Sequence, residues 1–234
     1  MKSVILFSGG IDSTTALAWA KARSADTHAL TFDYGQRHNV EVRLARWTAK
    51  RMGVLQTVLR LDLAGFGGSA LTNPSAALPR YRKPSDIRRG PPSTYVPFRN
   101  GVLIALAASF AEARGFDTVV CGFNIIDSPD YPDTRPEFVR AMEKAVRAGT
   151  RAAFGGPAIR IAAPFIRMRK SEIIRLGLRL GADYSRAVSC YAGAEEPCGT
   201  CASCVLRRQA FAEAGRPDPL LERLAGIGRK EGRR

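Results

Sequence analysis

The fold is decided by the stretch Ser3-Val4-Ile5-Leu6-Phe7-Ser8-Gly9-Gly10-Ile11-Asp12-Ser13, which continues as Thr14-Thr15-Ala16-Leu17. An apolar run of strand formers meets two glycines and then apolar residues at helical spacing, which predicts a strand, a tight turn and a helix. The paired glycines let the backbone bend, and the N–H groups of the turn converge where the helix dipole favours negative charge. The stretch therefore predicts an anion-binding turn, with an ordinary strand-to-helix turn as the alternative.

The turn is not a Walker loop. It lacks the G-x-x-x-x-G-K-[ST] spacing, and the nearest lysine, Lys21, lies two turns down the predicted helix. Ser8, Ser13 and Thr14 place hydroxyl donors at the turn instead. An anion site without that lysine suits a pyrophosphate that leaves after a reaction.

The length and composition favour one α/β domain with a small appendage. The chain has 234 residues, of which 45% are hydrophobic, and no apolar run approaches the length of a membrane span. We therefore expect a cytoplasmic protein with no membrane partner. The net charge of +15 invites a nucleic-acid hypothesis, but the arginines are spread along the chain and a positive field also serves an enzyme with a nucleotide substrate. Nucleic acid is therefore not the expected partner.

Strand and helix patterns alternate along the chain, which predicts right-handed βαβ units and a parallel five-stranded, doubly wound sheet. Asn100 is expected to cap a helix that ends at Gly115, and Pro136 to open another that ends at Gly149. The strands are expected at 3–7, 27–32, 54–61, 117–122 and 159–163.

Polar residues follow two of these strands directly. In an open parallel sheet such residues lie at the carboxyl edge, where ligands bind. The residues that we expect there are Asp33, Tyr34 and Gln36 after the second strand, and Asp127, Tyr131, Asp133 and Arg135 after the fourth. Asp33 and Asp127 could also be ordinary turn residues.

The segment from Ala64 to Thr94 is rich in glycine, proline and serine and carries several basic residues. Segments of this length without regular structure are uncommon in compact domains and often act as lids or binding segments. We expect a basic lid over a phosphate site, with a solvated insertion as the alternative. Protection of this segment from protease by ATP would distinguish the two.

Four cysteines, Cys190, Cys198, Cys201 and Cys204, have the spacing C-x7-C-x2-C-x2-C. Four thiolates without an open position predict a structural, tetrahedral zinc site, and an iron–sulfur cluster is the alternative. The fifth, Cys121, lies alone in a predicted buried strand and is interpreted as a core residue. The cysteines divide the chain into an α/β domain of residues 1–184 and a zinc-binding subdomain with a basic tail, residues 185–234.

The string from Ser8 to Ser13 resembles the signature of the ATP-pyrophosphatase (PP-loop) superfamily, and further motifs narrow the resemblance to the 7-cyano-7-deazaguanine synthase family. The similarity extends from about Ser3 to Pro217. Its motifs are F-S-G-G-I-D-S-T-T-A-L at 7–17, T-F-D-Y-G-Q-R-H at 31–38, V-P-F-R-N at 96–100, Y-P-D-T-R-P-E-F at 131–138, K-S-E-I at 170–173, and the four cysteines followed by Arg207 and Phe211.

The resemblance implies an ATP-dependent ligase that converts 7-carboxy-7-deazaguanine and ammonia, through an adenylated acid and an amide, to 7-cyano-7-deazaguanine, a queuosine and archaeosine precursor. It implies Mg²⁺ with ATP, structural Zn²⁺, and allows a homodimer. ATP would bind to Phe7, Ser8, Gly9, Gly10, Ile11, Asp12, Ser13, Thr14, Thr15, Ala16 and Leu17. The catalytic candidates are Asp12, Lys170 and Arg99. The acceptor would bind to Asp33, Tyr34, Gln36, Arg99, Asn100, Asp127, Tyr131, Asp133 and Arg135.

Three positions depart from the pattern of this family. Phe98 stands where a glycine is usual, Pro129-Asp130 where a Ser-Gly pair is usual, and Thr134 where a cysteine is usual. These segments belong to the expected acceptor pocket, so a diverged paralogue that acts on another carboxylate or amide is one alternative. A tRNA-modifying PP-loop enzyme, such as a thiolase or lysidine synthase, is a second. A zinc-containing binding module with an inactive nucleotide fold is the third.

Overall fold

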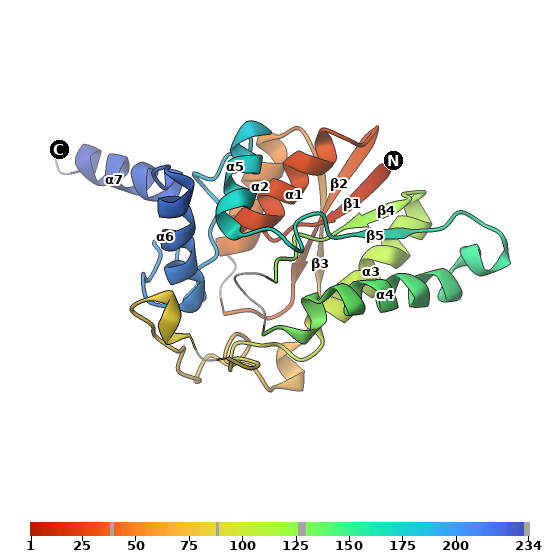
Figure 1. Cartoon of the computed structure of the whole chain (residues 1–234), viewed down its shortest axis with the longest axis horizontal. Coiled ribbons are helices and arrows are strands. Elements are labelled where there is room, and N and C mark those ends of the chain that lie inside the picture. Colours follow the sequence, from red (N-terminus) through yellow and green to blue (C-terminus); the bar gives the residue numbers. More distant parts are fainter. Residues whose placement is uncertain (38–39, 88, 126–129, 232–234) are drawn as a thin grey trace.

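The computed structural model describes residues 1–37, 40–87, 89–125 and 130–231, with side chains up to residue 226. These residues form a five-stranded parallel sheet of order β3-β2-β1-β4-β5 (Figure 1). This confirms the predicted sheet. The strands are β1 (Lys2–Leu6), β2 (Asp26–Asp33), β3 (Leu55–Arg60), β4 (Thr118–Val120) and β5 (Arg160–Ala162).

Helices cover both faces of the sheet because alternate residues of each buried strand point to opposite sides. On one face, Ile5 packs in a cluster with Leu17 of α1 (Ile11–Lys21), Ala45 of α2 (Val40–Arg51) and Ile173 of α5 (Lys170–Arg179). On the other face, the adjacent Val4 packs with residues of α3 (Arg99–Arg114) and α4 (Pro136–Gly149). The sheet therefore has a core layer on each side.

The strand order changes direction at β1, which pairs with β2 on one side and β4 on the other. In an open α/β sheet, the carboxyl ends of the strands at such a switch point leave a crevice in which ligands bind. The Ser8–Ser13 turn follows β1 at this place. Gly122 follows β4, and a Cβ atom there would lie 3.0 Å from the backbone of Asp12. The glycine thus lets the chain after β4 approach the first turn of α1 closely.

Short helices interrupt the connecting segments. They are the 3₁₀ turns η1 (Ala64–Phe66), η2 (Pro84–Asp86), η3 (Pro132–Thr134) and η4 (Arg151–Phe154). The basic segment 64–94 is anchored to the cysteine-rich region: the Tyr81 N–H donates to the Thr200 carbonyl at 2.7 Å, and Arg208 donates to the Arg82 carbonyl at 3.0 Å. Its function as a lid stays a prediction.

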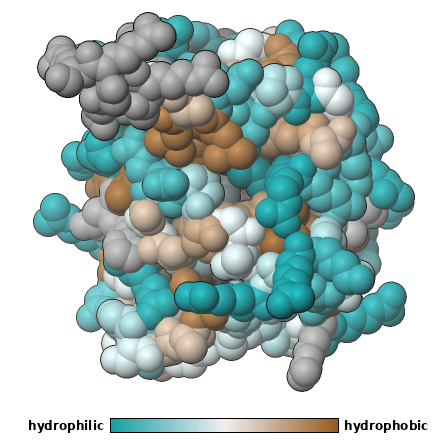
Figure 2. All heavy atoms as spheres, turned by 90° about the vertical axis from the view of Figure 1, so that its left-hand side faces the viewer, coloured by the Kyte–Doolittle hydropathy of each residue, from teal (hydrophilic) through white to brown (hydrophobic). Residues whose placement is uncertain are grey.

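The C-terminal helices α6 (Ala202–Ala214) and α7 (Pro219–Glu231) continue the core on the α1 and α5 side (Figure 1). Phe211 packs with Tyr184, Ala18 and Ile174 in one cluster of buried residues. The face that carries α6 and α7 is largely hydrophilic, with separate hydrophobic groups (Figure 2). No helix in the described ranges is long and apolar enough to cross a membrane. The domain boundary after residue 184 stays a prediction.

An ion pair links α6 to the residue that directly precedes α7. Arg207 and Asp218 lie 2.5 Å apart with 5% and 8% of their side chains exposed. Arg207 also donates to the Ala187 carbonyl. Because both charges are buried, removal of one would leave the other uncompensated, which is costly in protein interiors.

The prediction that Asn100 caps α3 was wrong. The cap is Phe98, which has a left-handed backbone (φ 51°), and the helix begins at Arg99. Asn100 lies in the first turn, where its N–H donates to Asp133 Oδ2 at 3.0 Å. A positive φ is strained for a bulky side chain, which explains why glycine is suited to position 98. Phe98 is held there by edge-to-face contact with Phe138, at 5.9 Å between ring centroids.

We expect Gly177→Ala to destabilise the protein by about 2 kcal/mol, the cost of overpacking a core less the gain in helix propensity. A Cβ atom at Gly177 would lie 1.8 Å from Tyr184 Oη and 2.8 Å from Thr15 Oγ1, and both residues are fully buried. Urea unfolding measures the change. Gly226→Ala in α7 is the matched control, because nothing lies within 4 Å of its added Cβ. Equal stability of the two variants would contradict this packing.

Candidate active site

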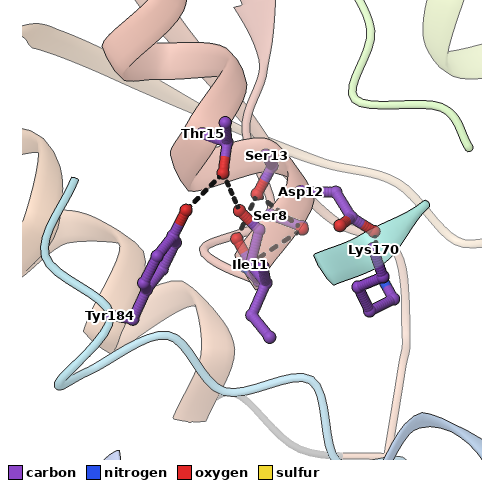
Figure 3. A network of polar contacts seen from close by, with 8 residues as sticks. Ser8, Ile11, Asp12, Ser13, Thr15, Lys170 and Tyr184 are labelled. Carbon is purple, nitrogen blue, oxygen red and sulfur yellow. Dashed lines mark hydrogen bonds and ion pairs between the residues drawn. The ribbon is translucent and has the colours of Figure 1, made fainter. Parts of the chain in front are cut away.

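The turn after β1 is held by hydroxyl groups. The Ser13 hydroxyl donates to the Gly10 carbonyl and accepts from the Gly9 N–H, both at 3.1 Å, and lies 3.1 Å from Ser8 Oγ (Figure 3). Gly9 has φ +84°, which favours glycine, and its Cβ would lie 3.1 Å from Ala45 of α2. Since the first N–H groups of α1 have no intrahelical acceptor, the fixed turn offers donors to an anion.

Asp12 and Lys170 form an ion pair beside this turn. Lys170 Nζ lies 2.5 Å from Asp12 Oδ2, and the side chains are 16% and 26% exposed (Figure 3). Asp12 Oδ1 is buried without a hydrogen-bond partner among the described residues. Asp12 comes from the first turn of α1 and Lys170 from the first turn of α5, so the fold joins two residues that are distant in sequence.

The later residues of the predicted ATP-binding stretch point away from the turn. Ala16 and Leu17 belong to the sheet core. Thr15 Oγ1 donates to the Ile11 carbonyl at 3.0 Å and lies 2.6 Å from Tyr184 Oη (Figure 3). Thr14 is also fully buried. The stretch therefore divides into a turn that faces the ligand crevice and a helix segment that secures it to the C-terminal region.

A cavity of about 350 Å³ opens at the turn. Its lining residues range from Leu6 to Arg207. The cavity therefore extends from the crevice at the sheet edge to the cysteine-rich region. From the predicted site the lining includes Phe7, Ser8, Gly10, Ile11, Asp12, Ser13, Lys170, Tyr34, Gln36, Arg99, Asn100 and Tyr131.

A second set of polar side chains lines the cavity around Arg99. Arg99 donates to the Tyr34 hydroxyl at 3.1 Å and has its guanidinium carbon 5.6 Å from the centre of that ring. Arg99 Nε is buried and, within the described part of the chain, has no hydrogen-bond partner. The Tyr131 hydroxyl lies 3.4 Å from the hydroxyls of Tyr191 and Thr94. The cavity thus combines a phosphate-type turn with a cluster of one cation and several hydroxyls.

Three predicted acceptor residues are not among the described residues that line the cavity: Asp33, Asp133 and Arg135. Asp33 ends β2, and its carbonyl accepts the Leu61 N–H. Asp133 is buried where it accepts the Asn100 N–H, so it fixes the start of α3. Arg135 is exposed. Predicted Asp127 lies outside the described residues, as does Pro129.

Other lining residues were missed by the sequence analysis, among them Glu41, Thr94 and Tyr191. Glu41 lies in the first turn of α2, directly beyond the polar end of β2, and this position was an available signal. Burial raises the pKa of the Glu41 carboxyl to about 7. The positive charge of Arg99 partly opposes this rise, and Cys190 adds a smaller increase. Burial also raises the pKa of Tyr191. Thr134, one of the departures from the family pattern, lines the cavity as well.

The four cysteines converge as their spacing predicts. Their sulfur atoms all lie within 4.8 Å of one another, and Cys198 Sγ is 4.0 Å from Cys204 Sγ. Sulfurs about 2.3 Å from a common zinc ion fit this separation. The cluster could therefore hold a metal ion. Because Cys190 and its neighbour Tyr191 line the cavity, the cluster also supports one cavity wall.

The fold and the turn define an α/β protein of the PP-loop type. NMN synthetase from Francisella tularensis has the same general fold, with a TM-score of 0.50 at 14% identity over 95% of this chain and 81% of that one. The chain belongs to the family of the queuosine biosynthesis protein QueC, whose family model matches residues 2–215.

Curated relatives match over almost their whole length. The chain is 46% identical over 221 residues to a 7-cyano-7-deazaguanine synthase of Nitrosococcus oceani, covering 93% of this chain and 96% of the relative. It is 47% identical over 221 residues to a protein of the same name in Azotobacter vinelandii, with the same coverage. The resemblance stated from the sequence motifs is thereby confirmed.

Proposed function

We propose that this protein is an ATP-dependent ligase that converts 7-carboxy-7-deazaguanine and ammonia to 7-cyano-7-deazaguanine. The observation that carries the proposal is one cavity lined both by the Ser8–Ser13 turn with the Asp12–Lys170 pair and by the Arg99 cluster. The first group suits the phosphates of ATP, and the second suits a polar heterocycle with a carboxylate. The name of the relatives supports the same reaction.

The first half of the reaction replaces a poor leaving group. A carboxylate oxygen of the acceptor attacks the α-phosphorus of ATP, which displaces pyrophosphate and forms the acyl adenylate. The N–H groups and hydroxyls of the turn bind the departing pyrophosphate, and Lys170 neutralises charge that develops during phosphoryl transfer. Ammonia then attacks the carbonyl carbon, loses a proton, and displaces AMP to give the amide.

The second half repeats the activation at the amide oxygen. That oxygen attacks the α-phosphorus of a second ATP, and pyrophosphate leaves again. Loss of two protons from the nitrogen and cleavage of the C–O bond then release AMP and form the nitrile. One cavity serves both halves because the acid and the amide differ only at the activated group.

Two metal ions belong to the proposal. Asp12 has a buried carboxylate oxygen without a described partner, which suits a Mg²⁺ ligand next to the phosphates. When bound, Mg²⁺ neutralises phosphate charge. The four cysteines would hold Zn²⁺ as a structural ion, since four thiolates leave no open position.

The test is an incubation of the purified protein with ATP, Mg²⁺, 7-carboxy-7-deazaguanine and an ammonium salt. We expect mass spectrometry to detect the amide and then the nitrile, and chromatography to detect AMP. A control without ammonium separates adenylation from nitrogen transfer, because it should still yield pyrophosphate. Turnover of another carboxylate in place of this acid would instead indicate a paralogue of different specificity.

A further inference from the structure

Glu41 is a carboxylate in the cavity that the proposed reaction does not use. Asp12 and Glu41 are the acidic residues in the described lining of the cavity. Asp12 Oδ2 is paired with Lys170, and Asp12 Oδ1 is assigned to Mg²⁺ in the proposed reaction. No hydrogen bond or ion pair within 4.0 Å is found for the Glu41 carboxylate in the ranges that the structure describes. Glu41 is half-buried and lines the cavity, so its carboxylate has acceptor capacity for a ligand.

Arg99 lies close enough to Glu41 to affect it electrostatically, but the two side chains form no ion pair among the described contacts. Arg99 instead bonds to Tyr34 and keeps its buried Nε–H unpaired with any described residue. The cavity therefore presents an acceptor and a donor that face the same space without satisfying each other.

The proposed acceptor, 7-carboxy-7-deazaguanine, has an edge whose hydrogen-bonding groups complement a carboxylate and a guanidinium. Its pyrimidine ring carries a carbonyl oxygen, which accepts a hydrogen bond, followed by a ring N–H and an exocyclic amino group, which both donate. A carboxylate accepts two parallel donors, and a guanidinium donates to a carbonyl. The acceptor's own carboxylate must reach ATP at the Ser8–Ser13 turn, so the pyrimidine edge is free to bind elsewhere in the cavity.

We infer that Glu41 is the specificity-determining residue for the acceptor, accepting hydrogen bonds from its ring N–H and 2-amino group while Arg99 donates to the adjacent carbonyl oxygen. The inference rests on the proposed function and extends it. It assigns Arg99 to acceptor recognition, in agreement with its contacts to Tyr34 and Asn100 rather than to the Asp12–Lys170 pair. Ligands without the donor pair should bind poorly.

The experiment compares two substrates and two proteins at pH 8, where the carboxylate is ionised. The substrates are 7-carboxy-7-deazaguanine and 7-carboxy-7-deazahypoxanthine, which lacks the 2-amino group. We expect the wild-type protein to prefer the first by about 10- to 100-fold in kcat/KM, the range for a hydrogen bond to a charged group. In Glu41→Gln this preference should fall to about 1- to 3-fold, mainly through KM for the first substrate, while KM for ATP stays unchanged.

Glu137→Gln is the matched control, because it makes the same change at a carboxylate on α4 that is 73% exposed. It should keep the full preference. Thermal unfolding verifies that both variants are folded, and binding of the acid without ATP, by calorimetry, gives a second readout. An unchanged preference in Glu41→Gln, or an equal loss of kcat for both substrates, overturns the inference while the function stands. A wild-type protein that neither binds nor converts the acid overturns both.

Discussion

Lys170→Ala is expected to lower the rate of pyrophosphate release by about 10²- to 10³-fold, the usual cost of removing one group that stabilises charge in a transition state. The Lys170 ammonium lies 2.5 Å from Asp12 beside the Ser8–Ser13 turn, and Lys170 lines the cavity. No other lysine lies in the described lining. The measurement is a coupled assay of pyrophosphate in the presence of ATP and the acid.

The control for this variant is Arg167→Ala. Arg167 is an exposed basic residue that is absent from the described lining of the cavity, so its removal tests the general positive field alone. It should change the rate by less than about 3-fold, because exposed charges are strongly screened. Thermal unfolding shows whether Lys170→Ala is folded, since it leaves Asp12 without its ion-pair partner. Wild-type rates in folded Lys170→Ala would remove this residue from the mechanism.

Cys204→Ser is expected to abolish stoichiometric zinc binding and to unfold the C-terminal region. Structural zinc contributes on the order of 10 kcal/mol in small peptides, against a total stability of about 5–15 kcal/mol for a typical domain. The cluster also holds the cavity wall at Cys190 and Tyr191, so the acid should no longer bind. Elemental analysis gives the metal content, and hydrogen exchange of residues 185–217 reports the local unfolding.

Cys121→Ala provides the comparison for the loss of a cysteine as such. Cys121 is fully buried next to the sheet, packs with the α3 side of the core, and lies outside the four-sulfur cluster. We expect it to keep its zinc and to lose about 1–2 kcal/mol, since a small buried side chain is truncated. If Cys204→Ser exchanged hydrogen as slowly as Cys121→Ala over residues 185–217, the cluster would have no structural function.

Local sequence patterns predicted much of the molecule because they report local physics. The strand and helix pattern around Ser8–Ser13 shows in β1 and α1, and the glycines stand where the backbone needs them. The cysteine spacing predicted a cluster because turns of two residues bring thiolates together. The same reasoning failed at Asn100, where a typical cap residue lies inside the helix. There, the contact of its N–H with Asp133 depends on the fold.

The cavity was predicted less completely. Tyr34, Arg99 and Tyr131 were expected at the site and line it. Asp133 was also expected there, but it is not among the described lining residues and instead accepts the Asn100 N–H at the start of α3. Glu41 and Tyr191 were not expected, because each lies beside a more prominent feature: Glu41 follows a polar strand end, and Tyr191 follows a cysteine. Which side of a helix or loop faces the cavity depends on how the element packs, and a single polar residue carries no periodic signal for that.

The sequence by itself determined the strand–turn–helix unit at Ser8–Ser13, the parallel α/β architecture and the four-cysteine cluster. Each of these depends on residues that are close in sequence or on an alternating pattern that one face of a sheet requires. The tertiary structure alone decided that Lys170 meets Asp12 across 158 residues, that the cysteine region forms a wall of the cavity, and that Glu41 and Arg99 line the same cavity. These relations arise because the parallel sheet places the carboxyl ends of its strands at one edge. In addition, α6 packs on α1 and α5, while Leu220 of α7 packs with Leu44 of α2 and with the cysteines, and this long-range burial sets the positions of the side chains.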